Sequence, residues 1–399
     1  MRHAETQDIE NELLNLIQNM RKLGISINTA NIIIKAIEIY PSFKEKKYKT
    51  LLSWCYRFLK RNNYSIRRTT HLGQELKANA KEEFVKFLNI IYSIRRTYNI
   101  NESYEYIINI DETPIWFEMS SNTTIEKIGN KSVTIKTFGS ERTRLSLLLA
   151  INANGGKLKP LIVFRGKFNS TKQNRLNKNL HVAKKELYVV CQENSWVTKE
   201  IFEFLLTNIL FPYGRFINKN SYKLLIMDRA STHYLTNLTS LLEKEKWKYC
   251  LIPPGLTRFA QPLDISINFP MKQYLINYDS LFRINTLNKI KPTEEDIINK
   301  IYEIWNDGSK ITKEMIFNSF KKPGISVKLD NSEKNLINVS DELIDLNDIP
   351  DPDNLINQED LINENQRELE NLNNKKHTQF KAQSSLLDYY MPSEDMDLC

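Results

Sequence analysis

Three aspartates in this 399-residue chain, Asp111, Asp228 and Asp264, are the residues whose type and spacing best suit chemistry. Asp111 and Asp228 each follow directly on a short apolar run with the composition of a β-strand, and 35 residues separate Asp228 from Asp264. Carboxylates at neighbouring strand ends lie close together, and like charges that close require a cation between them. Three carboxylates predict Mg²⁺ or Mn²⁺ rather than zinc. Two such ions about 4 Å apart activate a water or hydroxyl and stabilise the leaving oxygen of a phosphodiester.

A simpler interpretation of each acid is an ordinary turn residue or helix cap, and the position of any single aspartate favours it. Zinc and disulfide frameworks are not indicated, because the five histidines and four cysteines form no Cys-x-x-Cys or His-x-x-x-His cluster. The longest strongly apolar run, residues 145–151, is far shorter than the ~20 residues that span a bilayer, and the N-terminus lacks an apolar signal segment. We therefore expect a soluble protein of a reducing compartment, with no membrane partner.

The segment that carries the aspartates alternates between predicted strands and helices. Short apolar or alternating runs predict strands over residues 106–111, 132–137, 143–153, 158–164, 222–227 and 249–252. Helices are predicted over residues 198–210 and 235–247. Asn154-Gly155-Gly156 indicates a hairpin turn between two of the strands. Hairpin strands followed by strand–helix–strand predict an α/β fold, in which a mixed sheet is flanked by helices.

Three helices are predicted at the N-terminal end of the chain. Apolar residues at three- and four-residue spacing indicate helices over residues 8–23 and 28–39, followed by a basic amphipathic helix within 44–68. Trp54 and Phe58 in this last helix are expected to lie in the core. The segment has one acid and nine basic residues, which are Lys44, Lys46, Lys47, Lys49, Arg57, Lys60, Arg61, Arg67 and Arg68. Three short helices, the last of them basic, predict an all-α helix-turn-helix domain that binds DNA.

The net charge of +8 is the sum of two unlike parts. Residues 341–399 contain 15 acidic and 4 basic residues, a net charge of −11, so the preceding 340 residues carry +19. A body this basic predicts a polyanionic partner, nucleic acid in particular, although a surface tuned for solubility has the same charge. The acidic tail is rich in Asn, Asp and Glu and has few aromatic residues, which is typical of disorder.

Near the end of the tail, residues 383–390 have the pattern Gln-x-x-Leu-x-x-Tyr-Tyr of a sliding-clamp-binding box. The residues concerned are Gln383, Leu386, Tyr389 and Tyr390. Such a segment folds on binding, inserting the leucine and the two rings into a hydrophobic pocket while the glutamine hydrogen-bonds beside them. A chance arrangement of aromatic residues is the alternative. The pattern predicts a sliding clamp as a partner.

The chain resembles the pogo/Tigger-type DDE transposases in three acidic blocks. These are NIDETP at 109–114, DRASTH at 228–233, and a block at 253–264 that begins with two prolines and ends in QPLD. The blocks follow one another in the order and at the spacing of that family. Residues 143–167 resemble the hairpin of its catalytic domain, and residues 43–61 resemble the centromere-protein-B-type helix-turn-helix in front of it.

This resemblance implies an RNase-H-like fold and a Mg²⁺- or Mn²⁺-dependent DNA endonuclease and strand transferase with two metal ions. Asp111 would bridge both ions, and Asp228 and Asp264 would each complete one metal site. His233 would support a metal ligand or contact a phosphate, or else be a satisfied, partly buried histidine. Lys272 would contact DNA. The resemblance also implies double-stranded DNA at terminal inverted repeats as the substrate, a homodimer, and a nuclear location.

The chain departs from the family pattern in two places. Arg229 stands where the second block usually has asparagine, and its guanidinium either competes for the charge of Asp228 or points to a phosphate. Family members commonly carry two helix-turn-helix units, whereas one is evident here, which suggests a chain shortened at its N-terminus. The three acids are nevertheless intact, and this favours retained catalysis.

Two other functions remain open. One is a catalytically silent, transposase-derived DNA-binding protein of chromatin or gene regulation. The other is an RNase-H-like nuclease of RNA:DNA hybrids, against which the helix-turn-helix argues because hybrids are recognised by shape. The expected domains are a helix-turn-helix domain at 1–72, a connecting helix at 73–100, an RNase-H-like catalytic domain at 101–330, and a disordered acidic tail at 331–399.

Overall fold

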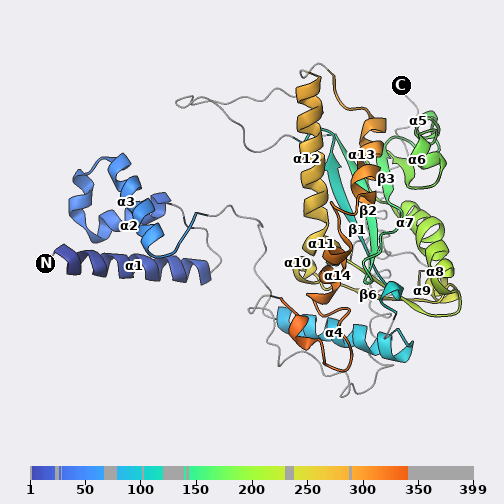
Figure 1. Ribbon diagram of the computed structural model, residues 1–399, viewed down its shortest axis with the longest axis horizontal. Coiled ribbons are helices and arrows are strands. Elements are labelled where there is room, and N and C mark those ends of the chain that lie inside the picture. Colours follow the sequence, from blue (N-terminus) through green and yellow to red (C-terminus); the bar gives the residue numbers. More distant parts are fainter. Residues whose placement is uncertain are drawn as a thin grey trace, which may run out of the picture. The chain divides into compact units, whose positions relative to one another are not determined.

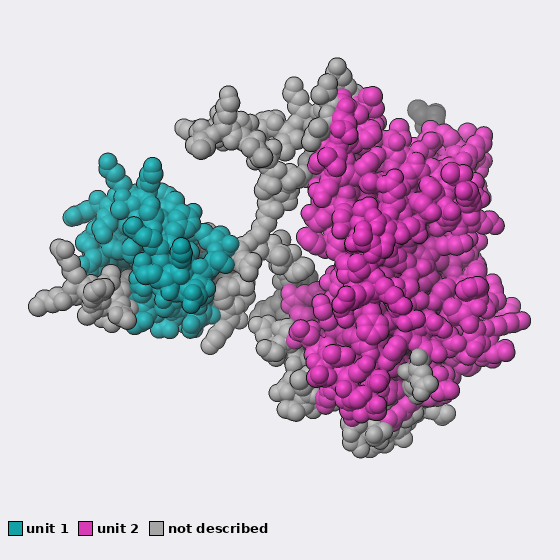
Figure 2. All heavy atoms as spheres, viewed as in Figure 1, with its two compact units in different colours: residues 1–77 teal, residues 78–399 magenta. Residues whose placement is uncertain are grey.

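The computed structural model divides the chain into two compact units, residues 1–77 and residues 78–399 (Figure 2). It describes residues 2–22, 27, 29–66, 79–100, 103–119, 139–140, 143–229, 238–286 and 290–339. The strand expected at 132–137, His233, Arg67, Arg68 and the tail from 340 onward lie outside these residues. In the described part of the chain, no helix combines the length and the apolar character needed to cross a membrane.

Unit 1 is helical, as expected (Figure 1). Its elements are α1 (Arg2–Lys22), α2 (Thr29–Ile39), a 3₁₀ turn (Pro41–Glu45) and α3 (Tyr48–Arg61). Side chains from all four form one core that includes Leu13, Ile32, Phe43, Cys55 and Phe58. Trp54 is partly buried and stacks on Phe58, with the ring centroids 5.7 Å apart. The interpretation of these two aromatic residues as core is therefore confirmed.

The basic segment of unit 1 contains less helix than its sequence predicts. α3 begins at Tyr48, and Lys44 lies in the 3₁₀ turn that Pro41 opens. The proline ring fixes φ and removes an amide donor, which suits the first residue of a helical turn and interrupts a continuous helix. α3 then ends at Arg61, because Asn63 adopts a left-handed backbone with φ of 58°.

Unit 2 is built on a six-stranded mixed sheet with the order β4-β3-β2-β1-β5-β6 (Figure 1). The strands are β1 (Ile107–Trp116), β2 (Arg144–Asn152), β3 (Leu161–Arg165), β4 (Tyr188–Gln192), β5 (Lys223–Met227) and β6 (Trp247–Leu251). β1, β2 and β3 are antiparallel neighbours, whereas β5 is parallel to β1, β6 to β5, and β4 to β3. The antiparallel strands β1 to β3, extended by the parallel strands β5 and β6, form the arrangement of an RNase-H-like fold, and β4 adds a further strand beside β3. The fold class predicted from the sequence is confirmed.

Helices cover both faces of the sheet (Figure 1). They are α4 (Ala80–Thr97), α5 (Thr171–Leu176), α6 (Leu180–Ala183), α7 (Lys199–Leu205), α8 (Phe211–Asn218), α9 (Leu238–Lys244), α10 (Thr257–Ala260), α11 (Pro262–Ser266), α12 (Asn268–Asn285), α13 (Glu294–Asn306) and α14 (Lys313–Lys321). Short 3₁₀ turns occupy Tyr104–Tyr106 and Lys334–Leu336. Apolar residues of α7, α8 and α9 pack on the face of β1 that carries Ile108 and Ile110. On the other face α11 contacts β1, α14 contacts β2 and α4 contacts β6.

Two elements differ from the sequence-based expectation in unit 2. The helix predicted over residues 198–210 passes through a π turn at Leu206–Leu210 and continues as α8 to Asn218. Pro212 has no amide hydrogen for the regular backbone hydrogen bond of an α-helix. The wider π turn before it lets the helix continue without that bond. The helix predicted over 235–247 ends earlier, at Lys244, because Lys246 takes a left-handed φ of 58° and β6 starts at Trp247.

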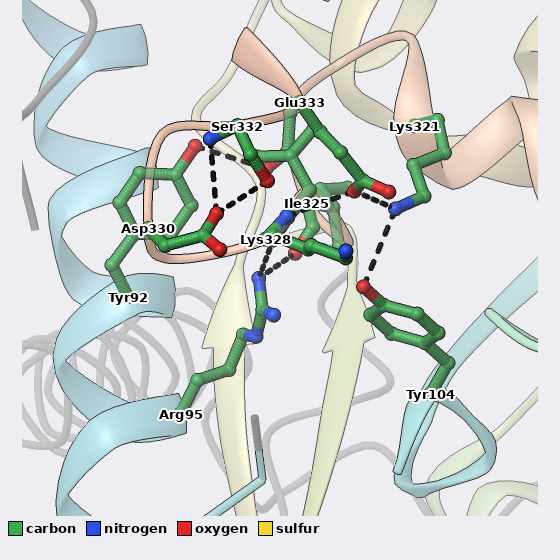
Figure 3. Close-up of polar contacts among 11 residues, drawn as sticks. Tyr92, Arg95, Tyr104, Lys321, Ile325, Lys328, Asp330, Ser332 and Glu333 are labelled. Carbon is green, nitrogen blue, oxygen red and sulfur yellow. Dashed lines mark hydrogen bonds and ion pairs between the residues drawn. The ribbon is translucent and has the colours of Figure 1, made fainter. Parts of the chain in front are cut away.

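A buried set of polar contacts ties α4 to the last described residues of unit 2 (Figure 3). The guanidinium of Arg95 is fully buried and donates to the carbonyls of Ile325 and Val327, at 3.0 and 2.8 Å. Beside it, the ammonium of Lys321 pairs with the carboxylate of Glu333. We call these contacts the C-terminal clasp. The two hydrogen bonds of Arg95 make α4, predicted as a connecting helix, an integral part of unit 2.

Candidate active site

Asp111 lies in the middle of β1 rather than after it. The expectation that both acids follow a strand is therefore wrong for Asp111 and right for Asp228, which comes directly after β5. The reason is the antiparallel partner, because β2 pairs with β1 as far as Trp116. On its other side β1 pairs with β5 only to Asn109, opposite Ile226. Two residues further along both strands, the same register sets Asp111 beside Asp228 where the strands no longer pair.

A pair of buried amides joins β1 to the third acidic block. Neither Asn109 nor Gln261 has any solvent exposure. The amide nitrogen of Asn109 donates to Gln261 Oε1 at 2.9 Å and to the Ile226 carbonyl at 3.0 Å. Gln261 Nε2 donates to the Ile110 carbonyl at 3.0 Å, and the backbone nitrogen of Leu263 donates to Asn109 Oδ1 at 3.1 Å. This amide pair fixes the start of α11 against the strand that carries Asp111.

Asp264 and Asp111 are bridged by one side chain, that of Asn268. Asp264 lies in α11, and Asn268 follows four residues later as the first residue of α12. Asn268 Nδ2 donates to Asp111 Oδ2 at 2.6 Å and to Asp264 Oδ1 at 2.8 Å. Because Asn268 is only 5% exposed, these two hydrogen bonds are shielded from water. The structure thus places carboxylates from the first and third blocks around one buried amide.

Opposing influences act on the pKa values of two groups at this site, the carboxyl of Asp111 and the ammonium of Lys272. Burial raises the pKa of the Asp111 carboxyl well above its ordinary value, and the charges of Asp264 and Asp228 raise it further. Hydrogen bonds from Asn268 and Gln261 act in the opposite direction. One turn along α12, burial lowers the pKa of the Lys272 ammonium, while the charges of Asp264 and Asp111 favour its charged form. Asp264 and Asp228 therefore both act on Asp111, and Lys272 interacts with Asp264 and Asp111.

The donor set suits a hard divalent cation. Among the described residues, no three His, Cys, Asp or Glu side chains are gathered closely enough to hold a metal ion as they stand. Two observations nevertheless fit such an ion. A cation between the carboxylates would relieve the repulsion that raises the pKa of Asp111. The buried Oδ1 of Asn268, for which the described residues provide no hydrogen-bond partner, is an oxygen of the kind that Mg²⁺ and Mn²⁺ prefer.

Of the two other residues singled out near Asp228 in the sequence, the structure describes Arg229 but not His233. Arg229 is partly buried directly after Asp228, and His233 falls in the segment outside the described residues. Asn109, Gln261 and Asn268 were not assigned a role from the sequence. Asn109 shares a strand face with Asp111, two residues further on, but the sequence does not indicate its pairing with Gln261 or the bridge that Asn268 forms.

Unit 1 offers a basic, exposed surface on α3. Lys49, Ser53, Arg57 and Lys60 are exposed at helical spacing, and Tyr56 between them is 50% exposed. We call these five residues the basic face of α3. Ser53 and Tyr56 were missed from the sequence because the prediction counted only charge.

The other basic residues predicted to bind DNA are distributed differently. Lys44, Lys46 and Lys47 are exposed on and just after the 3₁₀ turn that precedes α3. The guanidinium of Arg61 forms an ion pair with Glu10 of α1, so part of its binding capacity is used inside unit 1. Arg67 and Arg68, like the clamp-binding residues Gln383, Leu386, Tyr389 and Tyr390, lie outside the described residues.

Comparison with family models finds two matches in this chain. Residues 6–68 match the model described as "Tc5 transposase DNA-binding domain", and residues 142–320 match the model described as "DDE superfamily endonuclease". The first match covers α2 and α3 completely. The second contains Asp228 and Asp264 but begins after Asp111.

Curated proteins with similar sequences carry pogo in their names. "Pogo transposable element with KRAB domain" from Mus musculus is 25% identical over 344 residues, which cover 84% of this chain and 54% of that protein. The Homo sapiens protein of the same name gives the same identity and coverage. "Pogo transposable element with ZNF domain" from Homo sapiens is 21% identical over 268 residues, covering 67% of this chain and 18% of the relative. The chain thus spans about half the length of the first two relatives.

Solved structures of Mos1 transposase also resemble this chain. The Mos1 strand transfer complex has a TM-score of 0.43 and 12% sequence identity, covering 79% of this chain and 78% of the other. The mariner Mos1 paired end complex with Mg has a TM-score of 0.42 and 12% identity, covering 77% and 78%.

Proposed function

The chain belongs to the pogo/Tigger-type DDE transposases, and from this we propose that it binds double-stranded DNA through unit 1 and cleaves and joins DNA phosphodiesters at unit 2. The observation that carries the proposal is that Asp111 and Asp264 share the buried amide of Asn268, while the charge of Asp228 acts on Asp111. Terminal inverted repeats are the proposed substrate.

We propose that Asp111, Asp228 and Asp264 would hold Mg²⁺ or Mn²⁺ in this site, and that Asp111 would serve both of two ions. When bound, such ions lower the pKa of an attacking water or hydroxyl and stabilise the leaving oxygen of the phosphodiester. The amide pair of Asn109 and Gln261 keeps the first and third carboxylates in place, since it connects β1 directly to α11.

Lys272 is proposed to hold the DNA rather than to transfer protons. Its ammonium lies in the field of Asp264 and Asp111, so it can neutralise a phosphate that enters beside them. In unit 1, the basic face of α3 combines Lys49, Arg57 and Lys60, which suit phosphates, with Ser53 and Tyr56, which suit base edges.

A cleavage assay tests this proposal on DNA that contains the inverted repeats flanking the gene. The full chain is expected to bind this DNA and to cut it in Mg²⁺. Asp228→Ala is expected to bind equally well without cutting, whereas Arg57→Ala is expected to lose much of both binding and cleavage. Binding without any wild-type cleavage would replace the proposal by a catalytically silent DNA-binding protein.

The acidic tail is proposed to bind a sliding clamp through Gln383, Leu386, Tyr389 and Tyr390. Replacing both tyrosines by alanine is expected to abolish clamp binding in a pull-down, and unchanged binding would contradict this part. A homodimer that pairs two DNA ends, and a nuclear location, complete the proposal. Light scattering of the DNA complex and fluorescence microscopy of the tagged chain test these two expectations.

A further inference from the structure

We propose that Asn268 is a further metal-site residue, whose amide group serves the site in two ways. Without metal its nitrogen bridges Asp111 and Asp264, and with metal its oxygen faces the ion. This inference rests on the proposed metal site of the three aspartates.

The bridge itself is the first observation. The amide nitrogen of Asn268 has two hydrogens, and it donates to two different acids, at 2.6 Å to Asp111 Oδ2 and 2.8 Å to Asp264 Oδ1. The side chain is buried, with 5% exposure. The amide therefore occupies a position between two carboxylates, where a positive partner is most strongly favoured.

The oxygen of the same amide is the second observation. Asn268 Oδ1 is buried, and the described residues give it no hydrogen-bond partner. A buried carbonyl oxygen without a donor is unfavourable, and most native structures avoid it. An unpaired oxygen attached to a group that touches two proposed metal ligands has an evident use as a metal ligand itself, because Mg²⁺ and Mn²⁺ bind amide and carboxylate oxygens alike.

Rotation of the Asn268 side chain about its Cβ–Cγ bond would convert the metal-free arrangement into the metal-bound one. A half-turn exchanges the nitrogen and the oxygen of the amide without moving the backbone at the start of α12. The nitrogen suits two carboxylates that lack a cation, and the oxygen suits the same carboxylates when they hold one. Asparagine thus accommodates both states without gaining or losing a proton.

Other residues at this position would serve only one state. Aspartate would supply an oxygen ligand to the metal but would add a fourth negative charge to the metal-free site. Leucine has about the same size but would supply neither a donor nor a ligand. This difference makes the two substitutions a direct test.

The test measures Mn²⁺ binding to the metal-free full-length chain by isothermal titration calorimetry, together with the melting temperature with and without Mn²⁺. Asn268→Leu is expected to bind Mn²⁺ roughly 10- to 100-fold more weakly than wild type. Asn268→Asp is expected to melt below wild type without metal, to bind Mn²⁺ at least as tightly, and so to gain more in melting temperature from the metal. Asn277→Asp, an exposed substitution on the same helix, is the matched control and should behave like wild type.

The outcomes separate the inference from the proposed function. Equal Mn²⁺ binding by wild type and Asp111→Asn, or none by wild type, overturns the proposed metal site itself. If wild type binds and Asp111→Asn does not, weak binding by Asn268→Asp shows that Asn268 is only a hydrogen-bonding brace and overturns the inference. The inference is also overturned if Asn268→Leu binds Mn²⁺ with the affinity of the wild type. Should Asn268→Leu fail to fold, the Asn268→Asp result decides alone.

Discussion

Two neighbouring groups of side chains on the same face of β1 behave in opposite ways. Asn109 and Gln261 are neutral and fully buried, and their side-chain amides are paired with each other or with backbone groups. Two residues further along the strand, Asp111 is acted on by the charges of two other acids and accepts from a bridging amide whose oxygen has no partner among the described residues. The first group forms a closed set of hydrogen bonds, whereas the second brings like charges together and leaves the Asn268 oxygen without a partner among the described residues.

This difference shows how the fold keeps an unfavourable arrangement in place. Carboxylates that repel one another would move apart unless neighbouring structure prevented it. The amide pair provides that restraint, since it joins β1, β5 and α11 within a layer where every hydrogen bond is shielded from water. Asn109, which stabilises the fold, and Asp111, which is proposed for the chemistry, thus lie two residues apart on one strand.

The largest expected effect comes from removing the charge at the centre of the carboxylate group. Asp111→Asn should lower DNA cleavage by at least ~10³-fold, because it removes the proposed shared metal ligand. The same variant should be as stable as wild type without metal, since it also removes the repulsion. Gel-based cleavage and urea unfolding measure the two effects. A folded variant that still cuts would contradict the assignment.

The second largest effect is expected from a substitution that breaks the amide pair of Asn109 and Gln261. Gln261→Ala should lower the free energy of unfolding by about 2–4 kcal/mol, since it removes two buried hydrogen bonds, one from the Asn109 amide to Gln261 and one from Gln261 to the Ile110 carbonyl. Urea unfolding provides the measurement. Gln273→Ala, on the exposed side of α12, should change stability by less than about 0.5 kcal/mol.

The pH dependence of stability should distinguish the carboxylate group from the neutral amide pair, because only the carboxylate group titrates. The pKa of Asp111 is raised above its ordinary value of 3.8, so folded protein retains a proton that the unfolded chain has released. This contribution to stability is present below pH 3.8 and is lost as the pH rises through the higher folded pKa. The metal-free protein should therefore melt at lower temperature as pH rises across this window. The melting temperature of Asp111→Asn should not show this fall with rising pH. Added Mn²⁺ should make the melting temperature of the wild type rise with pH instead.

The smallest effect is expected at the adjacent acid, Glu112. Alternation along β1 turns it to the opposite face, where Ser146 Oγ donates to its carboxylate. Glu112→Gln should cost about 0.5–1.5 kcal/mol of stability and leave cleavage within about twofold of wild type. A loss of cleavage as large as that in Asp111→Asn would show that the chemistry is not confined to one face.

Much of the sheet could be predicted from the sequence because its strands are short apolar runs with clear ends. The turn at Asn154-Gly155-Gly156 was recognisable for a local reason, since Gly155 has a φ of 85° and Asn152 Oδ1 accepts from the Gly156 nitrogen at 2.7 Å. The length of β1 was not predictable in the same way. Glu112 and Pro114 have low strand propensity, and pairing with β2 extends the strand through them.

The three acids of the candidate site could be found from spacing, but the groups that position them could not. Asn109 and Gln261 are 152 residues apart, and nothing in either local sequence indicates that their amides meet. Asn268 looks like an ordinary polar residue at a helix start. Its bridging position follows from the way α11 and α12 approach β1, which is a property of the packed fold rather than of any segment.

The C-terminal clasp has a consequence for how the protein is made. Arg95 and Ile325 are 230 residues apart, so at a synthesis rate of ~5–20 residues per second the ribosome needs about 10–50 s to supply the carbonyl that this arginine requires. Until then the guanidinium of Arg95 cannot be buried at a low free-energy cost, and the nascent unit 2 lacks the contacts that hold α4 in place. A messenger truncated shortly after codon 320 would yield a chain that carries all three acids yet never closes.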